Sequence, residues 1–326
     1  MKKLLQIEDL RIYYKARRGL LGSIAIKAVD GVSIDVERGK TISIVGESGS
    51  GKTTLAKAIL KLLPLTSGKI ILDGEDINLI HPKDIKKFRR RVQGVFQDPY
   101  SSMNSYMNVG QILREPLGIH GIGNKTEQDY LVEQVLENVK LSHQEDLQSK
   151  YPHMLSGGQR QRIGLARALI LSPELVIADE PVSMIDASSR SEILYLMREI
   201  QNQLGTTFVL ITHDIATAKH FSDKIAVMYA GKIVEYGYPG QILDSPLHPY
   251  TKALIKSIPD PNPNNRLMER EVIPGEPPSA SSPPDGCRFH PRCQLFINGV
   301  CNLTDPKSIW IDESHQVSCH LIETNQ

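Results

Sequence analysis

Eight residues that join an apolar run to a helical segment constrain this chain more than any other feature. They read GESGSGKT, occupy positions 46–53 and match the pattern G-x-x-x-x-G-K-[ST]. The continuous run before them, residues 41–45, predicts a strand buried on both faces of a parallel sheet, and residues 55–63 read as a helix. Glycines let backbone N–H groups turn inward, and the following helix adds the positive end of its dipole. The sequence therefore predicts an α/β fold with a phosphate-binding loop.

The residue types in this loop assign its chemistry. Lys52 is expected to reach the β- and γ-phosphates of a bound nucleotide, and the Thr53 hydroxyl is expected to bind Mg²⁺. The candidate nucleotide-binding residues are Gly46, Ser48, Gly49, Ser50, Gly51, Lys52, Thr53 and Thr54.

A second apolar run, residues 175–178, ends in two carboxylates. Asp179 at the carboxyl end of a buried strand is placed to reach Mg²⁺, directly or through water. Glu180, one residue further on, is a candidate general base for the attacking water. Without other motifs, an Asp–Glu pair after a strand would be interpreted as a solvated strand end. The presence of the phosphate loop favours a catalytic role for the pair.

A second candidate anion site lies about 20 residues before Asp179, where residues 155–159 read LSGGQ and a helical run, residues 160–171, follows. A hydroxyl, two small residues and free N–H groups at a helix start suit a phosphate. One nucleotide does not need two such sites in one chain. The sequence therefore favours two chains packed head to tail, each LSGGQ facing the other's γ-phosphate.

Hydrophobic patterning divides the chain into three parts. Residues 1 to about 240 alternate strand-like runs, such as 207–211, with amphipathic helices, and residues 3–14, 31–36 and 70–72 are expected to form an antiparallel edge layer. Residues 109–150 lack strand-like runs and predict a helical insertion. From about residue 259 prolines interrupt regular structure, and a small module containing all four cysteines follows.

Charge and hydropathy exclude several classes of protein. Lys plus Arg is 38 and Asp plus Glu is 37, so the net charge of +1 argues against a dedicated nucleic-acid binder, which is typically basic. The sequence has no apolar run of the roughly 18 residues that a spanning helix needs. The first ten residues become polar too early for a signal peptide, so any link to a membrane is expected to come through a partner.

The motifs together resemble the ATP-binding-cassette (ABC) family. GESGSGKT, Gln97 in VFQDP, LSGGQ, LVIADE, Asp186 in SMIDAS and His213 in ITHD occur in that family's order over about residues 4–258. The resemblance implies a RecA-like core, an antiparallel β-subdomain, a helical subdomain at about 100–172, and two ATP molecules sandwiched in a dimer. Glu180 and His213 are both present, so the ATP site of this subunit is expected to be competent in hydrolysis.

The same resemblance implies roles for further residues. Gln97 would contact Mg²⁺ and the attacking water, and His213 would orient the γ-phosphate and the water. The partner's γ-phosphate would be held across the interface by a set consisting of Ser156, Gly157, Gly158, Gln159 and Asp186. The family stacks an aromatic ring on adenine, and Tyr14 is favoured here with Tyr13 as the alternative. Residues 15–24 are expected to form an inserted loop.

The four cysteines predict a metal-stapled module. Cys287, Cys293, Cys301 and Cys319 are separated by gaps of five, seven and seventeen residues, with few apolar residues between them to build a core. No close C-x₂₋₄-C pair is present, so a [4Fe–4S] cluster is preferred and Zn²⁺ is the second choice. Free thiols and two disulfides remain as alternatives. Neighbouring histidines (His290, His315 and His320) are expected to be ordinary residues rather than substitute ligands.

The C-terminal part of the sequence resembles one particular branch of this family. HPYTKALIKSIP (248–259), IPGEPPS (273–279) and GCRFHPRC (286–293) resemble the tail of oligopeptide/dipeptide importer ATP-binding subunits. This implies residues 1–258 as the nucleotide-binding domain, residues 259–326 as linker and Cys-rich module, and a place at the cytoplasmic face of the membrane. The implied partners are a homologous ATPase subunit, two permease subunits and, indirectly, an extracytoplasmic peptide-binding protein. The rivals are a nickel importer of the same family, an ABC-type ATPase that acts on nucleic acid or ribosomes, and a non-catalytic subunit.

Overall fold

An eight-stranded sheet forms the centre of the protein. The computed structural model describes residues 2–18, 22–98, 102–142, 146–257, 273 and 275–323. The strand order of this sheet is β11-β12-β10-β9-β3-β8-β7-β6. Its strands are β3 (Thr41–Val45), β6 (Val92–Val95), β7 (Leu175–Asp179), β8 (Thr207–Thr212), β9 (Lys224–Tyr229), β10 (Lys232–Gly237), β11 (Ser308–Trp310) and β12 (Gln316–Ser318). The predicted strands at 41–45, 175–178 and 207–211 are confirmed as β3, β7 and β8.

The central strands are parallel and buried on both faces. β3 pairs in parallel with β8 and β9, and β7 pairs in parallel with β8 and β6. Successive side chains alternate between the two faces. Along β8, Val209 and Ile211 pack into one core cluster, and Phe208 and Leu210 pack into the other. Each core is covered by different elements, which is why these strands read as continuous apolar runs.

A second sheet covers part of the first on one side. It has the order β2-β1-β4-β5 and consists of β1 (Lys3–Arg18), β2 (Gly22–Glu37), β4 (Ser67–Leu72) and β5 (Glu75–Asp76). Its strands are antiparallel, so the predicted edge layer is confirmed. The turn at Asp73 and Gly74 has φ values of 49° and 88°, as a two-residue hairpin requires.

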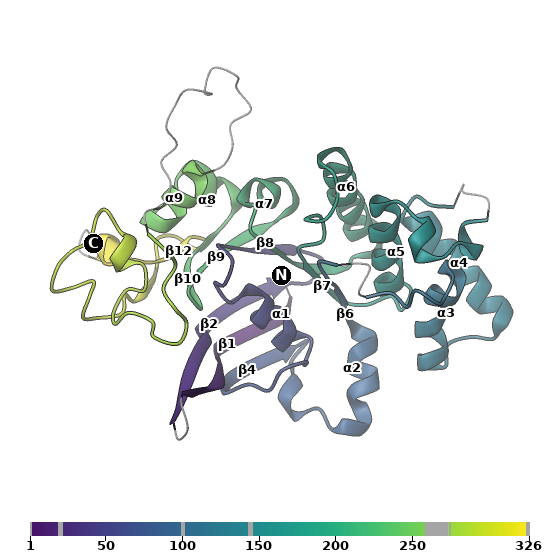
Figure 1. Cartoon of the computed structure of the whole chain (residues 1–326), viewed down its shortest axis with the longest axis horizontal. Coiled ribbons are helices and arrows are strands. Elements are labelled where there is room, and N and C mark those ends of the chain that lie inside the picture. Colours follow the sequence, from purple (N-terminus) through teal and green to yellow (C-terminus); the bar gives the residue numbers. More distant parts are fainter. Residues whose placement is uncertain are drawn as a thin grey trace, which may run out of the picture.

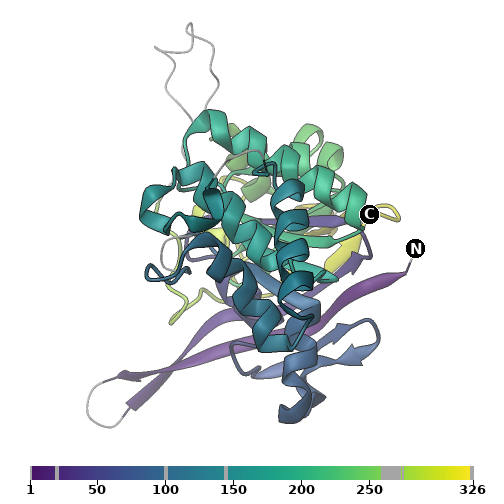
Figure 2. The same ribbon diagram turned by 90° about the vertical axis from the view of Figure 1, so that its right-hand side faces the viewer.

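The prediction that residues 15–24 form an inserted loop is wrong over most of that segment. β1 runs on to Arg18, β2 begins at Gly22, and Lys15 and Ala16 pair with Ala25 and Ile24. The resulting β1–β2 ribbon extends well beyond the rest of its sheet (Figures 1 and 2). Backbone pairing continues this ribbon past the buried residues of β1 and β2, where Lys15 and Arg17 are exposed and Ala16 and Ile24 are half-buried. The hydrophobic pattern therefore did not reveal the extension.

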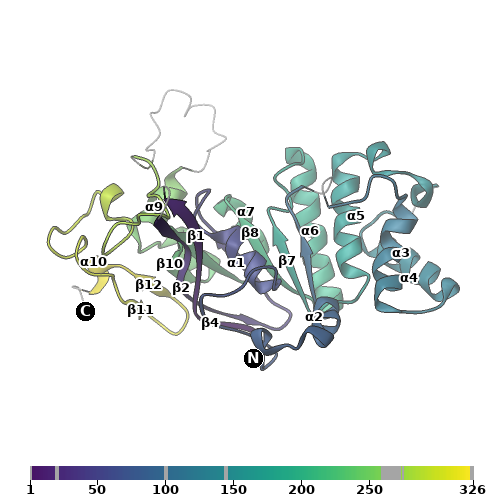
Figure 3. The ribbon, with the colours of Figure 1, turned by 60° about the horizontal axis from the view of Figure 1, so that its bottom comes forward.

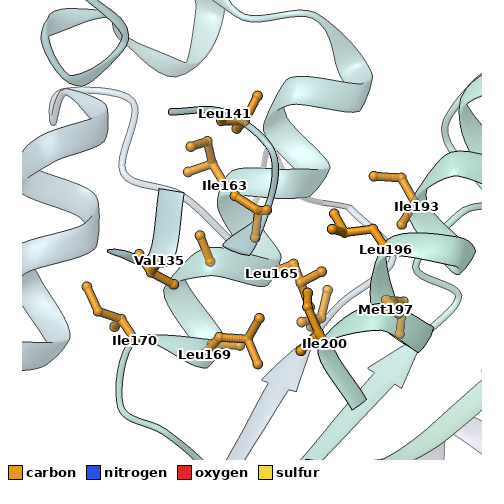
Figure 4. Close-up of a cluster of buried hydrophobic side chains, with 14 of the residues drawn as sticks. Val135, Leu141, Ile163, Leu165, Leu169, Ile170, Ile193, Leu196, Met197 and Ile200 are labelled. Atoms are coloured by element: carbon orange, nitrogen blue, oxygen red, sulfur yellow. The ribbon is translucent and has the colours of Figure 1, made fainter. Parts of the chain in front are cut away.

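The predicted helical insertion is confirmed. α3 (Val109–His120), α4 (Lys125–Asn138) and α5 (Gly157–Leu169) gather at one end of the molecule's long axis (Figure 1). Each begins with a capping box in which the N-cap side chain and the third helical residue exchange hydrogen bonds with the backbone. Their apolar faces pack with α6 (Ala187–Leu204) into one core, part of which is drawn in Figure 4.

The remaining helices cover the sheet from two sides. α1 (Lys52–Ile59) packs between the two sheets, in the core that contains Ile42 and Ile44. α7 (Ile215–Phe221), α8 (Pro239–Asp244) and α9 (Pro249–Lys256) cover the opposite face at the other end of the sheet (Figure 1). α2 (Ile85–Arg91) precedes β6, and α10 (His320–Glu323) follows β12.

The C-terminal residues continue the central sheet. β12 pairs with β10, and β11 pairs with β12, so this segment lies at the end of the molecule opposite to α3 and α4 (Figure 3). Most of the expected proline-rich linker, residues 259–272 and 274, lies outside the described residues. The division of the chain at residues 258 and 259 therefore stays a prediction.

A buried histidine makes the stability of this fold depend on pH. His248 is the N-cap of α9, and its Nδ1 accepts from the Tyr250 N–H at 3.0 Å. Burial lowers the pKa of His248 to about 4, although Glu235 opposes this and Lys252 adds to it. The unfolded chain, with a histidine pKa of about 6.5, binds more protons between these values, so stability falls as the pH drops from 6.5 towards 4.

We expect the His248 contribution to remove about 2 kcal/mol from the free energy of unfolding between pH 7 and pH 5. His248→Asn keeps an acceptor for the cap but does not titrate, so it is the matched control. Denaturant unfolding of both proteins at pH 7 and pH 5 measures the difference. Equal losses in the two proteins would contradict this account.

Candidate functional site

The predicted site residues follow neighbouring strands at one edge of the central sheet. Val45 pairs with Thr212, Asp179 with Ile211, and Val95 with Ala178, so the four parallel strands end at the same level. The phosphate loop follows β3, His213 follows β8, Glu180 follows β7, and Gln97 follows β6. The carboxyl edge of a parallel sheet thus brings together groups that are far apart in sequence.

The phosphate loop is pressed against two neighbouring backbones. A Cβ at Gly46 would lie 2.1 Å from the Met228 carbonyl oxygen, and one at Gly51 would lie 2.2 Å from the Ala28 carbonyl oxygen. Gly51 also has a φ of 105°, which other residues rarely adopt. Both glycines are therefore required by space, and Gly51 is required by its conformation as well. Ser48, Gly49, Ser50 and Thr54 complete the predicted loop and the start of α1.

The Lys52 side chain forms hydrogen bonds with the phosphate loop. Its Nζ donates to the carbonyl oxygens of Gly46 and Glu47, both at 2.8 Å, and lies 3.3 Å from Ser50 Oγ. Burial lowers the pKa of Lys52, and the carboxylates of Glu180, Asp179 and Glu47 oppose this. An ammonium group that is buried beside the loop suits a bound anion, because the anion would favour its charged form.

Thr53 and Asp179 are placed to share a cation. Thr53 Oγ1 donates to Asp179 Oδ1 at 3.4 Å, which is long for a hydroxyl donor. Burial raises the pKa of Asp179, and Glu180 adds to this. A divalent cation between these oxygens would favour the ionised carboxylate, and hydroxyl and carboxylate oxygens are ligands that Mg²⁺ prefers. The donor set therefore fits the predicted magnesium site.

Glu180 and His213 form a direct pair. His213 Nδ1 lies 2.9 Å from Glu180 Oε1, with the His213 side chain 60% exposed and Glu180 17% exposed. Glu180 has a φ of 49°, a left-handed conformation that costs about 1–2 kcal/mol for a non-glycine residue. Its N–H donates to the Ile211 carbonyl oxygen at 2.8 Å, which holds this turn against β8. The two predicted catalytic residues thus lie together, whereas Gln97 lies exposed beyond β6.

The two candidate adenine-binding tyrosines point to different places. Tyr14 is 38% exposed, and its Oη is 3.5 Å from Thr54 Oγ1 at the start of α1. The Tyr13 hydroxyl instead donates to Asp30. This geometry favours Tyr14 as the residue available to a nucleotide at the phosphate loop.

The LSGGQ segment lies away from this edge. Ser156 caps α5 by accepting from the Gln159 N–H at 3.2 Å, and Gln159 Oε1 accepts from the Ser156 N–H at 2.8 Å. Ser156 and Gly157 are exposed, and Gly158 follows them into α5. α5 lies with α3 and α4, whereas α1 lies near the middle of the molecule (Figures 1 and 3).

Asp186 likewise caps a helix beside this segment. It caps α6 by accepting from the Ser189 N–H at 2.9 Å, and it is exposed. That the LSGGQ segment and Asp186 act on the nucleotide of a second chain stays a prediction.

The cysteine module does not show the predicted metal centre. Within the described ranges, which include all four cysteines, no three His, Cys, Asp or Glu side chains are arranged to hold a metal ion. The four thiols are free, and the other three lie near enough to Cys287 to raise its pKa. Burial raises the pKa of Cys287 to about 12 and that of Cys319 to about 11, and the other thiols contribute. The sulfurs are thus neighbours without forming a coordination shell.

The nearby histidines make other contacts. His290 Nδ1 lies 2.9 Å from the Cys287 carbonyl oxygen, and His315 Nε2 lies 2.8 Å from Glu235 Oε1. His320 lies beside Thr304 and Glu323. That these three histidines are ordinary residues rather than metal ligands stays a prediction.

The fold and this edge define a phosphate-loop nucleoside triphosphatase of the ABC type. A family model described as ABC transporter matches residues 29–183, and one described as oligopeptide/dipeptide transporter, C-terminal region, matches residues 234–301. The chain is 42% identical over 322 residues to the oligopeptide transport ATP-binding protein AppF of Bacillus subtilis, covering 98% of this chain and 97% of that one.

Further relatives agree with this class. A putative peptide import ATP-binding protein of Brucella ovis is 40% identical over 316 residues, covering 97% of each chain. Among solved structures, cbiO1 of Clostridium perfringens, part of the transporter complex cbiONQ, has a TM-score of 0.64 at 30% identity, covering 74% of this chain and 91% of that one. A dimeric post-hydrolysis state of the ATP-binding cassette MJ0796, bound to ADP and phosphate, has a TM-score of 0.64 at 27% identity, covering 72% and 99%.

The chain belongs to the oligopeptide/dipeptide branch of the ABC transporter ATP-binding proteins. Within the part of the chain that the structure describes, no helix is long and apolar enough to cross a membrane.

Two residues that the sequence patterns did not single out, Tyr250 and Arg292, contact the phosphate loop at Glu47. Glu47 occupies a variable position of the loop motif, and its carboxylate pairs with Arg292 at 2.7 Å. Tyr250 Oη accepts from the Glu47 N–H at 2.9 Å. No spacing rule could have paired residues about 200 or more positions apart.

We predict that Gly51→Ala prevents the loop from forming, because its Cβ has no space and its φ is unfavourable. Gly49→Ala is the matched control, since Gly49 has a φ of 79° but no atom within 4 Å of the added Cβ. Titration with a fluorescent ATP analogue in Mg²⁺ is expected to show no binding for Gly51→Ala and measurable binding for Gly49→Ala. Similar affinities in the two variants would count against close packing of the loop.

Proposed function

We propose that this protein is the ATP-hydrolysing subunit that energises import of oligopeptides or dipeptides through a membrane ABC transporter. The observation that carries the proposal is the convergence of the phosphate loop, Asp179 and the Glu180–His213 pair at one sheet edge. Relatives named for peptide and oligopeptide transport, matched over nearly the whole chain, support the substrate class. The relatives named above are all transporter components or ABC cassettes, so an ATPase acting on nucleic acid or ribosomes is not favoured.

The chemistry follows from the residues at this edge. Water attacks the γ-phosphorus, the bond to the β–γ bridging oxygen breaks, and Glu180 accepts the proton from the water. Lys52 lies against the β- and γ-phosphate oxygens, and His213 orients the γ-phosphate and the water. Thr53, Asp179 and Gln97 would hold Mg²⁺, which would supply positive charge to neutralise the phosphates. Tyr14 stacks on the adenine.

Hydrolysis would drive motion through a shared nucleotide. The loop residues of one subunit and the partner's Ser156, Gly157, Gly158, Gln159 and Asp186 hold the same ATP in a closed dimer. Loss of the γ-phosphate removes contacts that only the closed state makes, so the dimer reopens. The nucleotide must bind the closed state better than the open one for this cycle to perform work.

The proposed partners follow from this role. A homologous ATPase subunit completes a heterodimer in the complex, and two copies of this chain form a homodimer when it is alone. The pair docks on two permease subunits at the cytoplasmic face of the membrane, and an extracytoplasmic binding protein delivers the peptide. Residues 1–258 would act as the nucleotide-binding domain and residues 259–326 as the linker and Cys-rich module.

We also propose that Cys287, Cys293, Cys301 and Cys319 hold a [4Fe–4S] cluster, with Zn²⁺ as the second choice. The proximity of the four thiols and the burial of Cys301 and Cys319 support this. The raised pKa values of Cys287, Cys293 and Cys319 mean that a cation is needed to keep these thiols as thiolates, which are the form that binds metal. Such a centre would be structural or would serve docking.

Glu180→Gln is predicted to lower ATP turnover by about a hundredfold or more, because the general base is lost while the nucleotide contacts remain. The variant should accumulate as an ATP-bound dimer, measured by light scattering during size-exclusion chromatography. Glu133→Gln, at an exposed position of α4, is the matched control and should behave as wild type. Unchanged turnover in Glu180→Gln would remove Glu180 from this role.

The cysteine proposal predicts about four irons and four inorganic sulfides per chain, with broad visible absorption, in protein purified without oxygen. Cys293→Ser should lose the colour and lower the melting temperature, because a ligand is removed. Elemental analysis and the visible spectrum measure both. One zinc per chain without colour would overturn the iron–sulfur assignment.

A further inference from the structure

Two buried arginines tie the segment GCRFHPRC to the rest of the protein. The side chains of Arg288 and Arg292 are each only 6% exposed. Arg288 pairs with Asp30 on β2 and donates to the Ala230 carbonyl oxygen. Arg292 makes a two-point ion pair with Glu47, with N–O distances of 2.7 and 3.2 Å. Arg292 therefore contacts the phosphate loop itself, from a position 245 residues away in sequence.

Aromatic rings fix the direction of the Arg292 side chain. Its guanidinium carbon lies 5.9 Å from the centre of the Tyr229 ring, and its Nη1 donates to Tyr229 Oη at 3.3 Å. Tyr229 packs in turn against Tyr250 and Phe289, with ring centres 4.5 and 5.2 Å away. Burial opposes ionisation of Arg292, but its hydrogen bonds to Glu47 and Tyr229 raise its pKa, so it remains charged.

Glu47 is held at three points by three separate parts of the chain. Its N–H donates to Tyr250 Oη at 2.9 Å, its carbonyl oxygen accepts from Lys52 Nζ at 2.8 Å, and its carboxylate binds Arg292. It also directly follows Gly46, where there is no room for a side chain. The position of Glu47 thus determines the position of the carbonyl that Lys52 binds.

The charge of Glu47 is unfavourable in a loop that must receive a triphosphate. An unpaired carboxylate at this position would repel the phosphates and would compete for Lys52. The bidentate contact with Arg292 neutralises this carboxylate and fixes its orientation.

We propose that Arg292 is a positioning residue for nucleotide binding: it neutralises Glu47 and holds the phosphate loop in its binding shape. Through its ion pair with Glu47, Arg292 connects the segment GCRFHPRC to the phosphate loop. This inference rests on the proposed function, because it assumes that the loop binds Mg-ATP.

The test compares dissociation constants for a fluorescent ATP analogue in Mg²⁺, using the full chain. Arg292→Ala should weaken binding by about tenfold or more, as is typical of a coupled site. Glu47→Gln alone should bind close to wild type, since the charge that needs neutralising is gone. The double variant Arg292→Ala/Glu47→Gln should regain most of the lost affinity.

Arg288→Ala is the matched control, because it removes the other buried arginine of the same segment without touching Glu47. Any affinity that it loses should not return when Glu47→Gln is added. At saturating ATP, the kcat of Arg292→Ala should change less than its KM. Thermal unfolding tests whether each variant folds, and Arg292→Gln replaces Arg292→Ala if the latter does not.

Wild-type affinity in the Arg292 variant would overturn the inference, and so would a loss of affinity that Glu47→Gln does not reverse. Failure of the wild-type protein to bind the analogue would instead overturn the proposed function.

Discussion

The close packing of the phosphate loop against two other backbones is the constraint on which the site depends. Gly46 lies against the end of β9, and Gly51 lies against β2. The first contact fixes the loop to the central sheet, and the second fixes it to the antiparallel sheet. A loop held in this way presents its N–H groups and Lys52 in a shape that exists before any ligand arrives, which lowers the entropic cost of binding.

The same packing explains how distant parts of the chain come to act together. The parallel strands β3, β8, β7 and β6 end at one level, so the loops after them meet without further adjustment. Residues that follow β10 in the chain contact the phosphate loop on another side, where Tyr250 and Arg292 bind Glu47. The C-terminal segment therefore contacts and stabilises the phosphate loop. The family model for the oligopeptide/dipeptide transporter C-terminal region, which matches residues 234–301, includes both Tyr250 and Arg292.

Sequence patterns predicted the parts of the structure that are determined locally. β3, β7 and β8 were predictable because strands buried on both faces read as continuous apolar runs, and the helices at 109–138 because of their spacing. Residues 15–18 and 22–24 were mistaken for a loop because strands that are held together by backbone pairing alone leave no apolar pattern in the sequence. The catalytic candidates could be placed because each directly follows a strand. The Glu47–Arg292 pair could not be predicted, because it depends on packing between residues far apart in sequence. The spacing of the four cysteines in the sequence did not determine how their side chains are arranged in space.

The proposed hydrolysis cycle requires two subunits to share each nucleotide, with Lys52 of one and Ser156 of the other on the same γ-phosphate. The separate positions of α1 and α5 in the chain are consistent with this (Figure 1). The most direct measurement is the structure of the assembly determined with Mg-ATP bound. We expect Lys52 of one subunit and Ser156 of the other to contact the same γ-phosphate across the interface. An interface that leaves the Ser156 of each subunit away from the partner's nucleotide would contradict it.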